Sequence, residues 1–185
     1  MDRPVRVLCV CTHNRTRSVM MTRLLEHHCD SLGVEVDVRS GGFVADGEPA
    51  TPETVRMLAD LGLDASPHRS RVLRAADASD ADLVVTAEHR HVIEIVGADP
   101  SLFARTFTLP EAVARGEEAG RRGDLTPSDW LAQVNRTRPN AIAYLDAVDE
   151  GSVGEIDDPT GRSKRHWTNS FEEIDDLTRR LAALL

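Results

Sequence analysis

The sequence lacks long hydrophobic runs. Its first apolar segment, residues 5–10, is interrupted by Arg6 and is too short for the hydrophobic region of a secretory signal. No other stretch approaches the roughly 18 consecutive apolar residues that span a bilayer. We therefore expect a cytoplasmic protein that does not associate with membranes.

Cysteine is also scarce, with three residues at positions Cys9, Cys11 and Cys29. An odd number at this spacing fits neither a disulfide framework nor a paired CxxC zinc site. His27 and His28 precede Cys29, but adjacent positions on a helix diverge, so a structural or surface role is favoured over metal binding. We expect reduced thiols, no metal site and no cofactor.

The chain also has too few basic residues to be positively charged. The chain has 22 basic and 31 acidic side chains, which gives a formal net charge of −9 at pH 7. Such a body repels polyanions at long range, so nucleic acids and anionic membranes are not expected partners. Any anion that the protein binds must be held by local groups. With 41% hydrophobic residues, the chain can bury one ordinary core, and we expect one domain over residues 1–185.

Strand and helix patterns alternate along the chain. Apolar and β-branched segments predict strands at 5–10, 34–38, 82–86 and 106–109, the second stopped by the Ser-Gly-Gly at 40–42. Spacing and capping signals predict helices after Thr16, over 51–61 and over 88–96, with glycines at 62 and 97 as stops. This alternation favours an α/β fold with a parallel sheet, helices on both faces and ligands at the carboxyl ends of the strands.

The segment around residues 111–150 is expected to be a helical insertion. It contains a helix with Thr126 as its cap, Pro127 in its first turn and Asp129 completing a capping box. We expect Trp130 and Trp167 to lie in the core. The last helix carries an apolar stripe, which favours packing on the sheet over a dimer seam and consists of Phe171, Ile174, Leu177, Leu181 and Leu184.

The residues that follow the first strand carry the chemistry. A thiol, Cys11, stands at the end of the strand, and Arg17 stands where the next helix begins. Backbone N–H groups in such a turn converge on one point, the helix N-terminus adds its positive end, and Arg17 can donate to two oxygens of a tetrahedral oxyanion. The same field favours a thiolate at Cys11 that attacks phosphorus in line. The other members of this predicted phosphate-binding loop are Thr12, His13, Asn14, Arg15, Thr16 and Ser18.

A thiolate displaces an alkoxide or phenoxide well only if the leaving oxygen is protonated. Asp158 is the candidate acid, because Pro159 biases it toward extended geometry in a loop from which a carboxyl group can project. Asp157 is the competing assignment. After the leaving group departs, the same carboxylate can activate the water that hydrolyses a phosphocysteine.

These residues resemble the low-molecular-weight protein tyrosine phosphatase family. The resemblance is carried by residues 7–18, by Ser-Gly-Gly at 40–42, by SPHRSR at 66–71 and by the late Asp-Pro pair, and it covers most of the chain apart from the insertion. It implies a four-stranded parallel sheet, a cysteinyl-phosphate intermediate and no metal. It assigns Cys11 as nucleophile, Arg17 as transition-state clamp and Asp158 as general acid. In the network that supports the loop it places Asn14, Ser18, Ser40 and His68.

Two loop positions depart from the family's pattern. Arg15 stands where many members have an apolar residue and the related arginine phosphatases have threonine, and a cation there disfavours a phosphoarginine guanidinium. Thr16 stands where many members have a second cysteine, so that protective disulfide cannot form.

The positions after Asp158–Pro159 also differ. Family tyrosine phosphatases commonly carry aromatic residues there to sandwich a phenyl ring, whereas this chain has Thr160 and Gly161. We hypothesise that the insertion, with its glycine-bearing segment 116–123, flanks the Asp158 loop and supplies the missing pocket wall.

The expected function is that of a phosphomonoesterase, first of all a protein tyrosine phosphatase acting on a phosphorylated protein or a small aryl phosphate. An arsenate reductase using an external low-molecular-weight thiol is the first alternative, because arsenate fits the same cradle. A noncatalytic phosphate-binding module is the second. The physiological substrate and the oligomeric state stay open.

Overall fold

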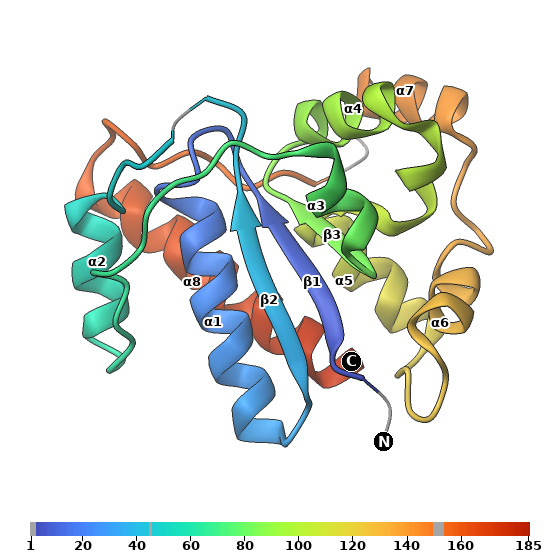
Figure 1. Cartoon of the computed structure of the whole chain (residues 1–185), viewed down its shortest axis with the longest axis horizontal. Coiled ribbons are helices and arrows are strands. Elements are labelled where there is room, and N and C mark those ends of the chain that lie inside the picture. Colours follow the sequence, from blue (N-terminus) through green and yellow to red (C-terminus); the bar gives the residue numbers. More distant parts are fainter. Residues whose placement is uncertain (1–2, 45, 150–153) are drawn as a thin grey trace.

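A computed structural model of the chain, which describes residues 3–44, 46–149 and 154–185, shows an α/β fold (Figure 1). Its strands pair in parallel in the order β2-β1-β3-β4. The four-stranded parallel sheet implied by the resemblance is confirmed. The strands are β1 (Val5–Val10), β2 (Val36–Gly41), β3 (Leu83–Thr86) and β4 (Thr106–Thr108).

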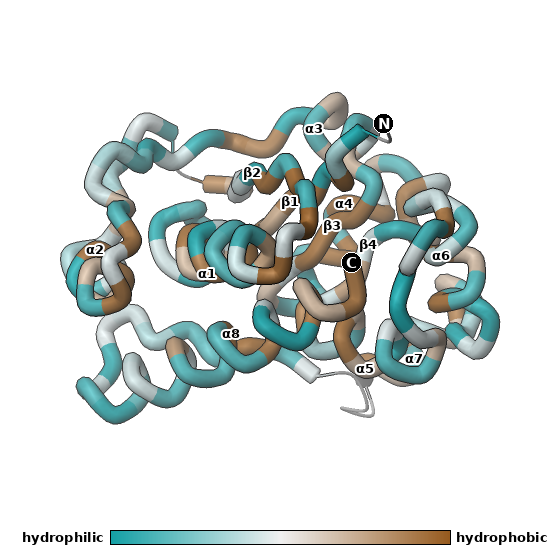
Figure 2. Tube along the Cα trace, turned by 90° about the horizontal axis from the view of Figure 1, so that it is seen from below, coloured by the Kyte–Doolittle hydropathy of each residue, from teal (hydrophilic) through white to brown (hydrophobic). Residues whose placement is uncertain are grey.

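The helices cover both faces of the sheet, as expected. β1 alternates, so that Val5, Val7 and Cys9 face one core while Leu8 and Val10 face another. The first core is closed by α1, α5 and α8, and the second by α3, α4 and η1. Figure 2 shows α1, α5 and α8 on one side of the strands and α3 on the other. The helices are α1 (Arg17–Leu32), α2 (Pro52–Ala59), α3 (Ala75–Asp80), α4 (His89–Ala98), η1 (Pro100–Arg105), α5 (Leu109–Ala119), α6 (Pro127–Val134), α7 (Ala141–Asp149) and α8 (Lys164–Leu184).

The apolar stripe of α8 is covered within the chain. Ile174 and Leu181 are fully buried, and α8 packs along α1 and α5. Trp130 and Trp167 are also buried, as predicted. Over the ranges that the structure describes, no helix has both the length and the apolar composition needed to cross a membrane.

Several element ends differ from the predictions because hydrogen bonds override local signals. The N–H of Val34 donates to the carbonyl of Cys29 and closes α1, so β2 begins only at Val36. Ser40 and Gly41 continue β2 rather than stop it, because they pair with the last residues of β1. Gly97 lies within α4, which continues to Ala98.

Thr126 is the N-cap of α6, as predicted, but Asp129 Oδ2 accepts from Thr126 Oγ1 at 2.7 Å and not from the Thr126 backbone N–H that a capping box uses. Thr126 Oγ1 accepts a hydrogen bond from the N–H of Asp129 at 3.2 Å. Residues 111–149 form most of α5 and all of α6 and α7, whereas Glu150 lies outside the described residues.

The position expected for residues 116–123 is wrong. Arg122 donates from its backbone N–H to Leu184 O at 2.7 Å and from Nε to Leu185 O at 2.8 Å. This segment therefore lies at the C-terminal end of α8, whereas the carbonyl of Asp157 accepts from Ser170 Oγ nearer the start of that helix. Ser170 and Leu184 are 14 residues apart on α8, which is about 21 Å, so residues 116–123 are too far away to form a wall at Asp158.

Candidate active site

The turn from β1 into α1 places Cys11 against the first turn of the helix. Cys11 is 3% exposed, and its Sγ lies 3.1 Å from Ser18 Oγ. Asn14 adopts the left-handed conformation with φ 51° and donates from Nδ2 to Ser18 Oγ at 3.0 Å. Because Ser18 Oγ accepts from Asn14, its own hydrogen can point at the sulfur. This arrangement stabilises negative charge on Cys11.

Asn14 is also the point at which other segments hold the loop. His68 Nε2 lies 2.7 Å from the carbonyl oxygen of Asn14 and donates to it, and the N–H of Arg71 donates to Asn14 Oδ1 at 3.0 Å. Burial lowers the pKa of His68, so the ring is neutral at pH 7 with its hydrogen on Nε2. The structure thus places Asn14, Ser18 and His68 in one network around the loop.

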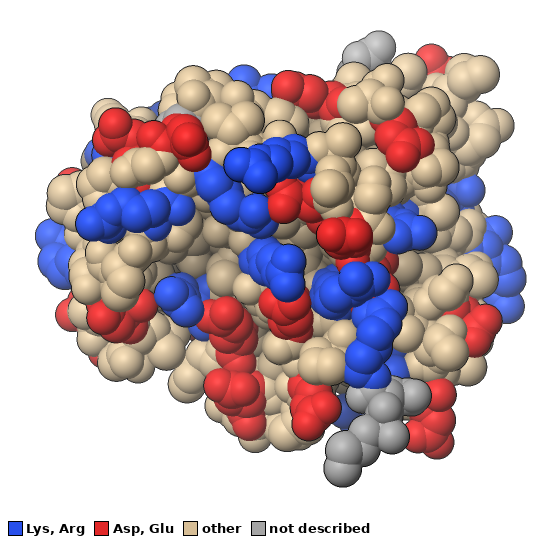
Figure 3. All heavy atoms as spheres, viewed as in Figure 1, with Lys and Arg blue, Asp and Glu red and all other residues tan. Residues whose placement is uncertain are grey.

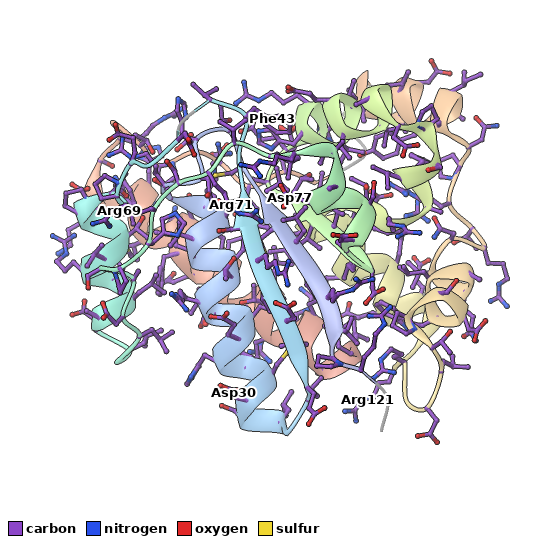
Figure 4. All side chains as sticks on the ribbon, viewed as in Figure 1. Asp30, Phe43, Arg69, Arg71, Asp77 and Arg121 are labelled. Atoms are coloured by element: carbon purple, nitrogen blue, oxygen red, sulfur yellow. The ribbon has the colours of Figure 1, made fainter. Side chains whose placement is uncertain are left out.

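Ser40 reaches this network through Arg71, a residue that sequence reasoning did not single out. Arg71 donates from Nε to the carbonyl of Ser40 at 2.6 Å and from Nη1 to Asp77 Oδ1 at 2.8 Å. Figure 4 shows Arg71 and Asp77 pointing toward one another beside the end of β2. The available sequence signal was the position of Arg71 at the end of the SPHRSR segment.

The backbone after β2 packs directly on the loop. Phe43 N–H donates to the carbonyl of Thr12 at 2.8 Å. A Cβ atom at Gly42 would lie 2.8 Å from both the backbone nitrogen of Asn14 and the carbonyl oxygen of Thr12. Only glycine allows this close approach.

The opposite side of the loop is tied to the start of α2. The carbonyl of Arg15 accepts from the N–H of Thr51 at 3.0 Å, and Arg15 Nε donates to the carbonyl of Pro49 at 2.8 Å. Thr16 Oγ1 lies 3.2 Å from Thr51 Oγ1. His13 is the exposed member of the loop.

Arg17 is buried and held by three residues from two separate segments. Its Nη1 donates to Glu88 Oε1 at 2.5 Å and to the carbonyl of Ile156 at 2.9 Å. Its Nη2 donates to Asp158 Oδ2 at 2.8 Å. Burial opposes ionisation of Glu88, but Arg17 and Arg90 together outweigh it and hold the pKa of that carboxyl below its usual value.

Glu88 is a site residue that sequence reasoning missed. The sequence pattern predicts only that a helix starts there. The signal that could have found it is its position just beyond the carboxyl end of β3, the strand that pairs with β1.

The structure brings Asp158, rather than Asp157, to Arg17. Asp157 is exposed, and its carbonyl accepts from Ser170 Oγ. Burial opposes ionisation of Asp158, but the N–H of Thr160, which donates to Oδ1 at 3.0 Å, and the charge of Arg17 outweigh it and lower its pKa. Asp158 is therefore ionised in this state.

Thr12 links the loop to α4. Its Oγ1 accepts from Arg90 Nη2 at 3.1 Å and lies 3.1 Å from His91 Nε2. Burial lowers the pKa of His91 to about 4, so this ring is neutral at pH 7. It stacks on Phe43 with ring centroids 5.5 Å apart. Sequence reasoning did not place Arg90 or His91 at the site.

Cys9, Cys29 and His28 take no part in the contacts described above. Burial raises the pKa of Cys9 and of Cys29 to about 12. His28 Nε2 lies 2.8 Å from Asp175 Oδ1 on α8. Among the described residues, no group of three His, Cys, Asp or Glu side chains is arranged to hold a metal ion.

A cysteine and an arginine joined by a short loop between a parallel strand and a helix define a cysteine-dependent phosphatase, a hydrolase. The chain belongs to the low molecular weight phosphotyrosine protein phosphatase family, whose model matches residues 6–116. The family expected from the sequence is confirmed.

Relatives agree on the class. The chain is 35% identical over 143 residues to a protein-arginine-phosphatase of Geobacillus stearothermophilus, covering 77% of this chain and 91% of the relative. It is 31% identical over 131 residues to the probable low molecular weight protein-tyrosine-phosphatase EpsP of Ralstonia solanacearum, covering 70% and 88%. A solved YwlE arginine phosphatase, a cysteine-to-serine mutant with a phosphorylated active site serine, matches with a TM-score of 0.72 and 26% identity, covering 96% and 93%.

Proposed function

We propose that this phosphatase hydrolyses phosphotyrosine in proteins through a cysteinyl-phosphate on Cys11. The observation that carries the proposal is the convergence of three groups beyond the carboxyl end of β1. The Ser18 hydroxyl supports the thiol of Cys11, Arg17 is the first residue of α1, and Asp158 contacts its guanidinium at 2.8 Å. A nucleophile, an oxyanion clamp and an acid are the parts that a metal-free phosphomonoesterase needs.

The first half-reaction forms the phosphoenzyme. The Cys11 thiolate attacks phosphorus, an S–P bond forms, and the bond to the leaving oxygen breaks. Protonated Asp158 transfers its proton to that oxygen, so the leaving group departs as a neutral phenol. Arg17 and the loop N–H groups stabilise the charge on the three equatorial oxygens.

The second half-reaction restores the thiolate. The Asp158 carboxylate removes a proton from water, the water oxygen attacks phosphorus, and the S–P bond breaks with its electron pair returning to Cys11. Inorganic phosphate leaves. Ser18 Oγ, at 3.1 Å from Sγ, supports the departing thiolate. The phosphorylated serine in the YwlE mutant supports an intermediate on the equivalent side chain.

Binding of phosphate prepares Asp158 to act as the acid. In this state Asp158 is ionised and accepts a hydrogen bond from Nη2 of Arg17. A phosphate dianion that binds Arg17 displaces the Asp158 carboxylate. Asp158 then lacks the neutralising contact with Arg17 and lies beside the negative charge of the phosphate. Each change raises the pKa of Asp158 toward the value that proton transfer to the leaving group needs.

Phosphoarginine is the second candidate substrate, because two relatives carry the name protein-arginine-phosphatase. Arg15 argues for phosphotyrosine first. Its guanidinium is partly exposed beside the loop and is held there by the carbonyl of Pro49. A guanidinium leaving group would approach this fixed positive charge, whereas a phenol is uncharged.

The proposal is tested by assaying wild type, Cys11→Ser and Cys29→Ser on a phosphotyrosine peptide, a phosphoarginine peptide and p-nitrophenyl phosphate. We expect Cys11→Ser to abolish turnover and Cys29→Ser, a buried cysteine outside the site, to retain it. A Cys11→Ser rate close to that of wild type would show that the nucleophile is wrong. Faster turnover of phosphoarginine than of phosphotyrosine would assign the second substrate.

The alternatives make different predictions. Arsenate reduction through an internal thiol relay is disfavoured because Cys9 and Cys29 are fully buried, so this reaction would require an external thiol. A noncatalytic module would bind phosphate without turnover of any of these substrates.

The free cysteines support our placement of the reaction in the reducing cytoplasm.

A further inference from the structure

A run of cations follows the candidate acid. Arg162, Lys164 and Arg165 are all exposed. The N–H of Arg162 donates to the carbonyl of Pro159 at 2.9 Å, and Gly161 has φ 76°, so residues 159–162 form a tight turn. The Cα atoms at the ends of such a turn are less than about 7 Å apart. The turn therefore keeps Arg162 close to Asp158, and Lys164 and Arg165 follow it at the start of α8.

The helix gains nothing from these cations. Lys164 and Arg165 lie in the first turn of α8, which has no acidic residue there. A helix N-terminus carries partial positive charge, so cations in the first turn are electrostatically unfavourable. By contrast, α5 and α6 carry Glu111 and Asp129 in their first turns.

The same cations differ from others at the surface. Figure 3 shows acidic and basic side chains interspersed over one face of the molecule. Arg71 pairs with Asp77 and Arg90 pairs with Glu88, but within the described ranges none of Arg162, Lys164 and Arg165 forms an ion pair. The exposed acid nearest in sequence is Asp157, on the other side of Asp158.

We propose that Arg162, Lys164 and Arg165, here called the basic turn, bind acidic side chains that flank the phosphorylated residue of a protein substrate. This inference rests on the proposed function and specifies its substrate class. An extended peptide advances about 3.3 Å per residue, so glutamates within a few residues of the phosphorylated side chain can reach these cations. In a chain of net charge −9, a local positive surface is what admits such a substrate.

The test compares two phosphotyrosine peptides, one with glutamates on both sides and one with glutamines in their place. Wild type should show a higher kcat/KM for the acidic peptide. In Arg162→Gln/Arg165→Gln, kcat/KM for that peptide should fall about five- to tenfold, as expected for two exposed ion pairs. The glutamine peptide and p-nitrophenyl phosphate should be unaffected. Salt above about 0.5 M should reduce the preference of wild type.

A matched control is Arg121→Gln/Arg136→Gln, which removes the same charge from exposed positions. Arg121 lies far from the end of β2 in Figure 4, and Arg136 follows α6. This variant should leave both peptides unchanged. The thermal midpoint of Arg162→Gln/Arg165→Gln should equal or exceed that of wild type, because a cation leaves the start of α8.

Several results would overturn the inference. Equal turnover of the two peptides by wild type would do so, as would equal losses on both peptides and on p-nitrophenyl phosphate in Arg162→Gln/Arg165→Gln. A different outcome would assign the basic turn to nucleic-acid binding. In that case wild type turns over both peptides equally, single-stranded RNA inhibits it, and Arg162→Gln/Arg165→Gln is not inhibited.

Failure of the proposed function gives a different result, namely no turnover of p-nitrophenyl phosphate by wild type. In that case fluorescence anisotropy still decides the inference. Cys11→Ser should bind the labelled acidic phosphopeptide more tightly than the glutamine peptide, and equal affinities would overturn it.

Discussion

Arg17 and Arg138 are both buried, but their hydrogen-bond partners differ. Arg138 donates to both carboxylate oxygens of Glu111, at 2.9 and 3.0 Å, and to the carbonyls of Phe103 and Thr106. Its guanidinium also lies 4.0 Å from the ring centroids of Phe103 and Phe107. Arg17 has Glu88, one carbonyl and Asp158, whose side chain is 42% exposed.

The contrast shows that burial alone does not distinguish the arginine that we propose as the oxyanion clamp from a structural one. The partners of Arg138 named above are structural. They join the segment after α6, where Arg138 lies, to η1, β4 and α5. Arg17 has a half-exposed partner, Asp158, which an oxyanion replaces in the mechanism that we propose. The two sites should therefore respond oppositely to substitution, one in activity and the other in stability.

The largest effect is expected for Arg17→Lys. Lysine keeps the charge but loses the planar fork that donates to two oxygens at once, so kcat/KM for p-nitrophenyl phosphate should fall about 10³-fold. Circular dichroism and thermal unfolding should show a folded protein. Retention of more than about a tenth of the wild-type rate would mean that Arg17 does not clamp the phosphoryl group.

The comparison is sharpened by Arg138→Met. This change leaves Glu111, which is 7% exposed, with Arg115 as its remaining cation. The free energy of unfolding should fall by about 3 kcal/mol in urea titrations. The kcat/KM of the folded fraction should equal that of wild type. A loss of activity with unchanged stability would contradict the structural assignment of Arg138.

A smaller effect is expected for Asp158→Asn. Phenyl phosphate has a poor leaving group, and its kcat/KM should fall about 10²-fold without a general acid. The acid must carry a proton in the enzyme–substrate complex, so wild-type kcat falls as pH rises through the pKa of Asp158 in that complex, whereas asparagine does not titrate. The alkaline decline should therefore be weaker in the variant, with Asp157→Asn as the matched control. Identical pH profiles for wild type and Asp158→Asn would exclude this acid.

Local sequence predicted the loop because its parts are contiguous. A β-branched strand, an asparagine able to adopt positive φ and a helix beginning at Arg17 all lie within residues 5–18. Glu88 could not be found in this way, because it contacts Arg17 across 71 residues and depends on the pairing of β3 with β1. Residues 116–123 were misplaced because their position depends on the direction in which α8 crosses the sheet.

By itself, the sequence determined the alternation of strands and helices, the Cys11 loop and the identity of the thiol and guanidinium. These features follow from short-range spacing and backbone preference. Only the tertiary structure decided that Asp158 rather than Asp157 meets Arg17, that Glu88 holds the other side of the guanidinium, and that Arg138 has partners only within the fold. Such contacts join segments distant in sequence, so they arise only when strand pairing and helix packing bring those segments together.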